Sequence, residues 1–302
     1  MEWKSALKLF LGYKKAQNVS ARTLQDYEYF VSQFFKRFPN AFNDEKLKSA
    51  AYEYLSDDMK PATYNLRLNN LRVFINFCIK EGYISKNPFK DFKHRKADNR
   101  IVQIDADIFK KLLKLPNLKT FAGLRDYALI LLTLDTGIRP SEAFSLLIDN
   151  INLDAMEVYV RSEEAKTRIK RTLPISYVTV NALQKLINAR PKDWGKNIPL
   201  FCTEYGTKLN RHRWADRMRR YSEELGIKIM PYSLRHGFAL QFLRNGGNAF
   251  ALQRLLGHTD MAMTKRYVAL TDDDLREQHK ESSPLNIILP KKQRIRNIKP
   301  RD

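Results

Sequence analysis

The chain has 302 residues and a mass of 35.5 kDa, which is enough for one or two domains with their own hydrophobic cores. Hydrophobic residues make up 43% and charged residues 29%, a balance that excludes a disordered chain. The charge is unusual, because 54 Lys and Arg face 33 Asp and Glu and give a net charge of +21. This excess favours an anionic partner, of which nucleic acid is the commonest and a membrane surface is the alternative.

Several classes of protein are excluded by motifs that the sequence lacks. The longest nearly apolar run, residues 127–134, is far shorter than the roughly 20 residues of a spanning helix, and no apolar signal region precedes it. We therefore expect a cytoplasmic protein without membrane association. Cys78 and Cys202 lie far apart and the five histidines show no ligand spacing, so we expect neither disulfides nor a metal. No G-x-x-x-x-G-K-S/T motif occurs, which predicts chemistry without a nucleotide cofactor.

Residues 1–90 have the pattern of a helical domain. Apolar residues recur at three- and four-residue spacing from Leu24 to Phe38, after a capping residue at Ser20, and again from Tyr64 to Cys78, between Pro61 and Gly82. We assign the aromatic residues of these stripes to the core. The outer faces carry side chains suited to phosphates and base edges: Arg22, Lys36, Asn65, Arg67, Asn69 and Arg72. A solvated helix face gives the same pattern, so both interpretations stay open.

A basic segment follows, and residues 91–102 are predicted to link two domains. Asn87-Pro88 stops the helical pattern, and few apolar residues occur in the segment. Its cations Lys93, Arg95 and Lys96 suit a phosphate backbone, while a solvated loop is the alternative.

Helices are predicted over residues 105–115 and 123–134, the second of which ends at Thr136-Gly137. Pro140 favours a new helix with Arg139 at its start, and Glu142 is close enough in sequence to hold that guanidinium. Residues 156–175 alternate apolar and polar side chains around a charged centre. This alternation predicts a two- or three-stranded hairpin with Lys166 near its tip.

A further helix opens at Pro231 and places Tyr232 and Arg235 on one face. A shorter helix ends at Gly257, directly before His258, and Tyr267 comes nine residues later. The series T-G-I-R-P-S-E (136–142), a lysine hairpin, S-L-R-H (233–236), L-L-G-H (255–258) and a tyrosine resembles the tyrosine recombinase family, also called phage integrases, in its Xer-like two-domain form.

The resemblance implies a mainly α fold with a small β-hairpin or sheet in the catalytic domain, an α+β arrangement. It implies a helical core-binding domain over 1–90, the basic linker over 91–102, a catalytic domain over 103–285 and a basic C-terminal tail over 286–302. Residues 285–289 fit either a segment that packs on a neighbouring protomer or a local element of their own domain.

The resemblance also implies roles for single residues. Arg139 and Arg235 match the two catalytic arginines, Lys166 the hairpin lysine, His258 the second histidine-or-tryptophan position and Tyr267 the nucleophile. Tyr232 stands where the family commonly has histidine; a phenol is a poor base at neutral pH but a good donor, so we expect it to position the phosphate. Supporting roles fall to Glu142 and to His236, which we expect to be structural beside Arg235.

The implied function is site-specific DNA recombination without cofactor or metal. Tyr267 attacks a phosphodiester, leaves a 3′-phosphotyrosine and a free 5′-hydroxyl, and a partner duplex is rejoined in integration, excision or resolution. Two planar guanidiniums stabilise the charge that builds on the phosphate. The expected partner is double-stranded DNA with a specific site, bound by a homotetramer on synapsed DNA and a monomer or dimer off DNA. The alternatives are a type IB topoisomerase-like nicking and closing enzyme and a non-catalytic DNA-binding relative.

Overall fold

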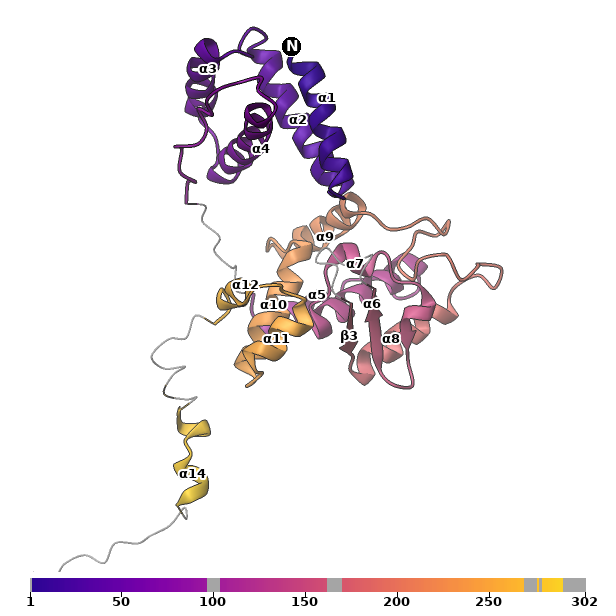
Figure 1. Cartoon of the computed structure of the whole chain (residues 1–302). Helices are drawn as coiled ribbons and strands as arrows, with labels where there is room; N and C mark the ends of the chain where they lie inside the picture. The colour runs from indigo at the N-terminus through magenta and orange to yellow at the C-terminus, as the bar shows by residue number, and fades with distance from the viewer. Residues whose placement is uncertain (1, 97–103, 162–169, 269–275, 277–278, 290–302) are drawn as a thin grey trace, which may run out of the picture. The chain divides into compact units, whose positions relative to one another are not determined.

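The chain is described by a computed structural model over residues 2–96, 104–161, 170–268, 276 and 279–289 (Figure 1). Its internal contacts divide it into two compact units, residues 1–100 and 101–302. The structure is mainly helical with one small antiparallel sheet in the second unit, which confirms the predicted α+β class. No helix among the described residues is both long enough and apolar enough to cross a membrane.

The described part of the first unit consists of helices α1 (Trp3–Ala16), α2 (Ala21–Arg37), α3 (Asp44–Ser56) and α4 (Pro61–Lys80). Their core is aromatic: Phe10, Phe34, Phe35 and Phe74 are fully buried and meet mostly edge to face. The stripes assigned to the core from the sequence therefore do form it. The predicted boundaries follow from local chemistry, since Ser20 accepts a hydrogen bond from the Thr23 amide at the start of α2.

The segment after α4 packs back onto that helix as far as the description of the first unit extends. Arg72 donates to the carbonyls of Phe89 and Phe92, at 3.0 and 2.6 Å from Nη2. The Arg95 guanidinium lies 3.9 Å from the centre of the Tyr64 ring. The described N-terminal part of the predicted linker is thus attached to α4, while residues 97–102 lie outside the description.

The second unit begins with helices and a short sheet. In chain order these are α5 (Ala106–Leu112), α6 (Phe121–Thr136), α7 (Pro140–Ala143), η1 (Ile148–Asn150), β1 (Ile151–Asn152), β2 (Glu157–Val160) and β3 (Arg171–Pro174). Strands β1, β2 and β3 are antiparallel neighbours in that order, and Val158 opposes Leu173. The predicted hairpin is therefore present, although its tip at residues 162–169, Lys166 included, lies outside the described residues.

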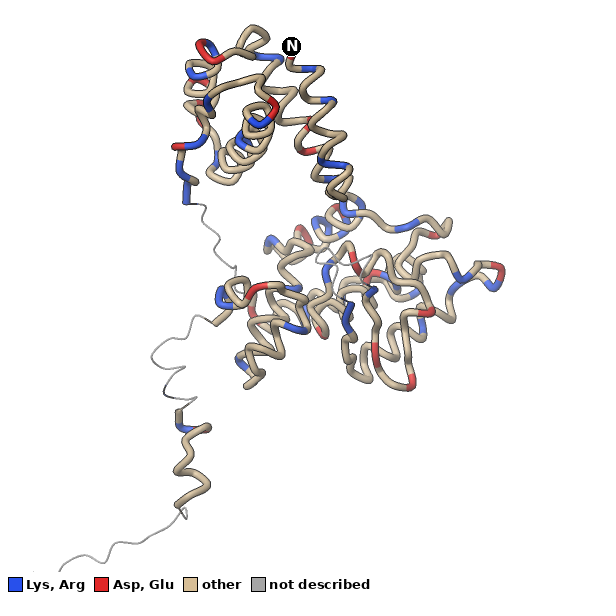
Figure 2. Tube along the Cα trace, in the orientation of Figure 1, with Lys and Arg blue, Asp and Glu red and all other residues tan. Residues whose placement is uncertain are grey.

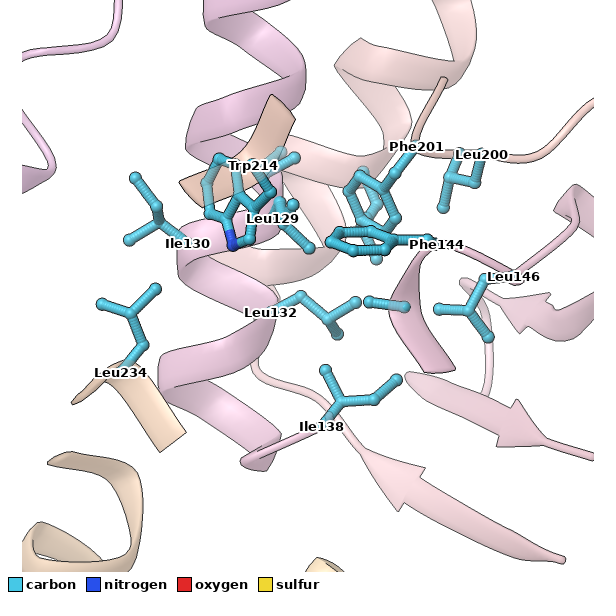
Figure 3. Packing of buried hydrophobic residues seen from close by; sticks show 14 of the residues in the cluster. Leu129, Ile130, Leu132, Ile138, Phe144, Leu146, Leu200, Phe201, Trp214 and Leu234 are labelled. Carbon is cyan, nitrogen blue, oxygen red and sulfur yellow. The ribbon is translucent and has the colours of Figure 1, made fainter. Parts of the chain in front are cut away.

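Helices α8 (Tyr177–Asn188), α9 (Arg211–Leu225), α10 (Pro231–Arg244), α11 (Ala249–Leu256), α12 (Met261–Lys265) and α14 (Leu285–Ile288) complete the described second unit. Helix α6 runs through its core and packs against α8 and α10. Figure 3 shows Leu129 and Leu132 of α6 facing Phe144 and Trp214, and Trp214 is almost fully buried. This packing fixes the direction in which α6 ends, and its end leads directly to Arg139.

A buried polar network also joins α6 to α9. Asp126 has no exposed surface and accepts hydrogen bonds from Arg125 and from the Tyr221 hydroxyl, the latter at 2.8 Å. Arg217 of α9 contacts the same carboxylate. Lysine and arginine occur in both units (Figure 2), so the excess of positive charge is not confined to one of them.

Candidate active site

The C-terminal ends of two helices form the frame of the site. Helix α6 ends at Thr136 and α11 at Leu256, and each is followed by a glycine in the left-handed region, Gly137 at φ 64° and Gly257 at φ 61°. A Cβ atom on Gly137 would lie 2.4 Å from Phe238 Cδ1 and 2.6 Å from Leu256 Cδ2. Only glycine meets both the conformation and the space at this position.

Two arginines bind the main-chain carbonyls at these helix ends. Arg235, on α10, is 3% exposed and donates from Nη1 to the Gly137 carbonyl at 2.6 Å and from Nη2 to the Leu256 carbonyl at 2.9 Å. Arg139 is 4% exposed and donates from Nη2 to the Gly257 carbonyl at 3.1 Å. A helix C-terminus carries partial negative charge, so it stabilises cations that would otherwise be costly to bury.

Glu142 contributes a formal negative charge to the site, in addition to the partial charges of the helix ends. Its carboxylate is buried and accepts from both the backbone amide and Nη1 of Arg139, each at 3.0 Å, at the start of α7. Arg171 of β3 donates to the same carboxylate at 2.6 Å and, from Nε, to the Leu255 carbonyl at 2.9 Å. Burial alone would raise the pKa of Glu142, but Arg171 and Arg139 outweigh it and the pKa is lowered.

Sequence reasoning missed Arg171, which lies in the predicted hairpin but was assigned no role. A signal was present: residues 171, 173 and 175 share one face of a strand, and Leu173 and Ile175 are buried. A cation on the apolar face of a strand needs a buried partner, and Glu142 is that partner here.

His258 lies between the arginines and the tyrosine. Its Nε2 is 3.1 Å from Nη2 of Arg235, and its Nδ1 is 2.9 Å from Oγ1 of Thr264. Burial, with the charges of Arg235 and Arg139, lowers the pKa of His258 to about 4. The imidazole is therefore neutral at neutral pH, with Nε2 accepting from Arg235 and Nδ1–H donating to Thr264. Burial, followed by Arg139, lowers the pKa of Arg235 to about 10, which still leaves it charged.

Tyr267 follows α12 and completes the cluster. Its ring lies parallel to that of His258, with an interplanar angle of 10° and 6.5 Å between centroids. Its hydroxyl lies 2.7 Å from Nδ1 of His236, a contact that the sequence did not predict. Burial raises the pKa of Tyr267 and the nearby Arg235 opposes the rise, but the pKa stays raised, so the hydroxyl is protonated at neutral pH.

Tyr232 lies at the edge of this cluster. It is 41% exposed, and its ring centroid is 6.3 Å from that of His236. Within the described residues its hydroxyl has no hydrogen-bond partner, so it is accessible to a ligand. A cavity of about 1330 Å³ opens beside His258, and several of its lining residues are basic: Arg161, Lys170, Arg171 and Arg254.

The side chains of residues 1–96 that were predicted to face DNA fall into two groups, those that bind other parts of the chain and those that are exposed. Several bind the chain itself: Arg67 contacts Asp57, Arg72 the Phe89 and Phe92 carbonyls, Asn65 the backbone of Arg95, and Asn69 the His94 ring. Arg22 pairs with Asp26 on the exposed face of α2. Lys36, Lys93 and Lys96 are exposed. DNA contact by these residues stays a prediction, and for the first group the structure supplies a packing role.

The geometry can be compared with that of known proteins. Residues 103–274 match the model of the phage integrase family. The chain belongs to this family. It is 28% identical over 292 residues to the tyrosine recombinase XerC of Thermodesulfovibrio yellowstonii, covering 92% of this chain and 95% of the relative. It is 31% identical over 230 residues to XerC of Alcanivorax borkumensis, covering 74% and 73%.

The fold is also that of a solved recombinase. A structure of the Tn1549 transposon integrase in complex with transposon right end DNA superposes with a TM-score of 0.73 at 19% identity, covering 93% of this chain and 99% of that one. The family match and the tyrosine recombinases, which cover 92% and 74% of this chain, make it a site-specific DNA recombinase of the tyrosine type. The comparisons do not favour a topoisomerase-like enzyme or a non-catalytic relative.

Proposed function

We propose that Tyr267 is the nucleophile of this recombinase and that it cleaves one strand of a double-stranded DNA site. The observation that carries the proposal is a continuous set of contacts. Arg139 and Arg235 both bind carbonyls at the end of α11, Arg235 contacts His258, and the Tyr267 ring lies parallel to that histidine. Attack by Oη would give a 3′-phosphotyrosine and a free 5′-hydroxyl, and a 5′-hydroxyl from a partner duplex would reverse the step.

The roles of the other residues follow from charge. The attacked phosphate gains negative charge in the transition state, and two permanently charged, buried guanidiniums stabilise it strongly because little water screens them. His258 is neutral, so it adds no positive charge, but its hydrogen bond fixes the orientation of Arg235. Tyr232, which is partly exposed, is proposed to donate a hydrogen bond to a phosphate oxygen. Lys166 is proposed as the acid that protonates the leaving 5′-oxygen; its position lies outside the described residues.

The proposed working form is a homotetramer on two synapsed duplexes, with a monomer or dimer off DNA. Its proposed location is the cytoplasm, in association with the nucleoid when it binds DNA. A short apolar helix supports assembly between copies: in α14, Leu285, Ile287 and Ile288 are all exposed, Ile287 by 93%. Exposed side chains of this size favour a protein interface. Double-stranded DNA as substrate is supported by the net charge of +21 and by the basic cavity beside His258.

The test is covalent capture on nicked suicide duplexes that carry candidate sites from the DNA flanking the gene. Wild-type protein should form an adduct linked through the 3′-phosphate, and Tyr267→Phe should form none while it binds the duplex equally well. Strand exchange between two duplexes, rather than relaxation of supercoils alone, identifies recombination. Failure of wild type to form an adduct on any site it binds would overturn the assignment of Tyr267.

A further inference from the structure

The hydroxyl of Tyr267 needs a proton acceptor, and the position where the family commonly has histidine offers none. Tyr232 occupies that position, and a phenol does not take up a proton from another phenol at neutral pH. Its ring also has no ring contact with Tyr267; the ring between them is that of His236, at 6.3 Å from Tyr232 and 5.7 Å from Tyr267. The acceptor must therefore be another group.

Both ring nitrogens of His258, the second histidine of the cluster, already form hydrogen bonds. Arg235 donates to its Nε2, and its Nδ1–H donates to Thr264. Neither ring nitrogen keeps a lone pair for the nucleophile.

His236 has the required geometry. Its Nδ1 lies 2.7 Å from Tyr267 Oη, and no other described residue forms a hydrogen bond with that hydroxyl. Successive side chains on a helix diverge by about 100°, so Arg235 binds the two helix ends while His236, the next residue, reaches the tyrosine. Burial, with the charges of Arg235 and Arg266, lowers the pKa of His236, which keeps the imidazole neutral at neutral pH.

We propose that His236 is the general base of strand cleavage and accepts the Tyr267 proton at Nδ1. The inference rests on the proposed function of Tyr267. As the Oη–P bond forms and the P–O5′ bond breaks, the proton passes from Oη to Nδ1 and leaves an imidazolium, while a separate acid, proposed as Lys166, protonates O5′. In rejoining, the incoming 5′-hydroxyl returns its proton to that amine, and His236 returns its own to the departing tyrosine oxygen.

The first test is single-turnover cleavage by His236→Asn. Asparagine presents Oδ1 close to the position of Nδ1 and accepts the tyrosine hydrogen bond, but it does not take up the proton. A base at this position predicts a rate about 10²-fold or more below wild type. A rate within threefold of wild type would show that His236 only positions the hydroxyl, and would overturn the inference. His212→Asn, an exposed histidine on α9, is the matched control and should cleave normally.

The second test separates the base from the acid. With a 5′-bridging phosphorothiolate the leaving group is a thiolate, which needs no proton. This substrate should restore cleavage in Lys166→Ala and leave His236→Asn slow. Recovery of His236→Asn on the thiolate would mean that His236 acts on the leaving group, which contradicts the inference.

The pH profile gives a third readout. The titratable and charged groups that face His236 are Arg235 and Tyr232 on α10, with Arg266 and Tyr267 beyond α12. Above pH 7 the wild-type rate should be flat, since His236 is already neutral. The rate of His236→Asn should rise about tenfold per pH unit as hydroxide replaces the missing base. A flat profile in the variant would contradict a base at this position.

Folding and the proposed function are controlled separately. If His236→Asn melts below wild type or fails to bind the duplex, His236→Ala is assayed with added imidazole, which should restore cleavage if a base is missing and should not if a fold is missing. If wild type forms no adduct, the proposed function of Tyr267 fails. If wild type forms the adduct and His236→Asn forms it equally fast, only the role of His236 fails.

Discussion

Nη2 of Arg171, on strand β3, lies 2.6 Å from Oε2 of Glu142, although the two residues are 29 positions apart in the chain. The same carboxylate holds Arg139, so one buried anion fixes two buried cations on different elements. The sheet and the start of α7 are thereby joined at the site. This relationship makes Glu142 the residue whose charge the cluster depends on most.

Replacing Glu142 with glutamine should leave both guanidiniums buried without a counter-charge. We expect a loss of about 3–5 kcal/mol in the free energy of unfolding, the usual cost of removing one partner from a buried ion pair. Urea unfolding monitored by circular dichroism measures it. Asp107→Asn is the control, because its pair with Lys110 lies on the surface, and it should leave stability unchanged. A Glu142→Gln protein within about 1 kcal/mol of wild type would contradict the assigned role.

Gly137→Ala should cost both stability and cleavage. The left-handed backbone costs an L-residue about 1–2 kcal/mol, and the new Cβ meets Phe238 and Leu256, which adds about 1–3 kcal/mol. Cleavage should fall as well, since the Gly137 carbonyl binds Arg235. Gly226→Ala separates the terms: Gly226 has a similar φ of 65° but nothing within 4 Å of a Cβ. Equal losses in the two variants, by thermal melting, would refute the steric part.

Stability should fall as the pH drops from about 6.5 to about 4. The pKa of His258 is lowered to about 4 in the folded protein, so the folded state binds fewer protons than the unfolded one. The contribution of His258 to the free energy of unfolding is fully present above pH 6.5 and is lost progressively below it. It amounts to at most about 3 kcal/mol. His236, shifted in the same direction, contributes separately. The melting temperature should depend less on pH in His258→Asn than in wild type, whereas replacing the exposed His279 with Asn should leave that dependence unchanged. A pH dependence in His258→Asn equal to that of wild type would refute this.

Binding to duplex DNA should weaken steeply with salt. Each phosphate that the protein neutralises contributes a slope of about −0.9 to log K against log salt concentration. Arg254 is exposed and lines the cavity beside His258, so Arg254→Ala should reduce the slope by about 0.9 while leaving the fold intact. Fluorescence anisotropy over a salt series measures it. A slope near zero in wild type would rule out an electrostatic origin for the affinity.

The elements that the sequence predicted are those with strong local signals. Helices α2, α4, α6, α10 and α11 each combine apolar periodicity with a cap, a proline start or a glycine end. Helix α9 escaped prediction because its buried stripe is narrow, namely Trp214, Met218 and Tyr221 among many charged residues. Its stability comes from packing on α6 and from Asp126, which is far away in sequence.

The site was predictable residue by residue but, apart from the contact between Arg139 and Glu142, not contact by contact. The spacing of Arg139, Arg235, His258 and Tyr267 is visible in the sequence. Their hydrogen-bond partners are not, since most are main-chain carbonyls or side chains more than 20 positions away. The same reason explains His236, which helical spacing places next to Arg235 but cannot relate to a tyrosine 31 residues later.

The arginines of the site are held largely by peptide carbonyls at residues 137, 255, 256 and 257. A peptide carbonyl is unaffected by the choice of side chain, so a library that randomises Leu255 and Leu256 alters packing and leaves these acceptors in the chain. Inserting or deleting one residue near the end of α6 or α11 has the opposite effect, because it rotates the carbonyls by about 100°. Engineering of this enzyme should therefore tolerate substitutions at residues 255 and 256 far better than insertions or deletions near the helix ends.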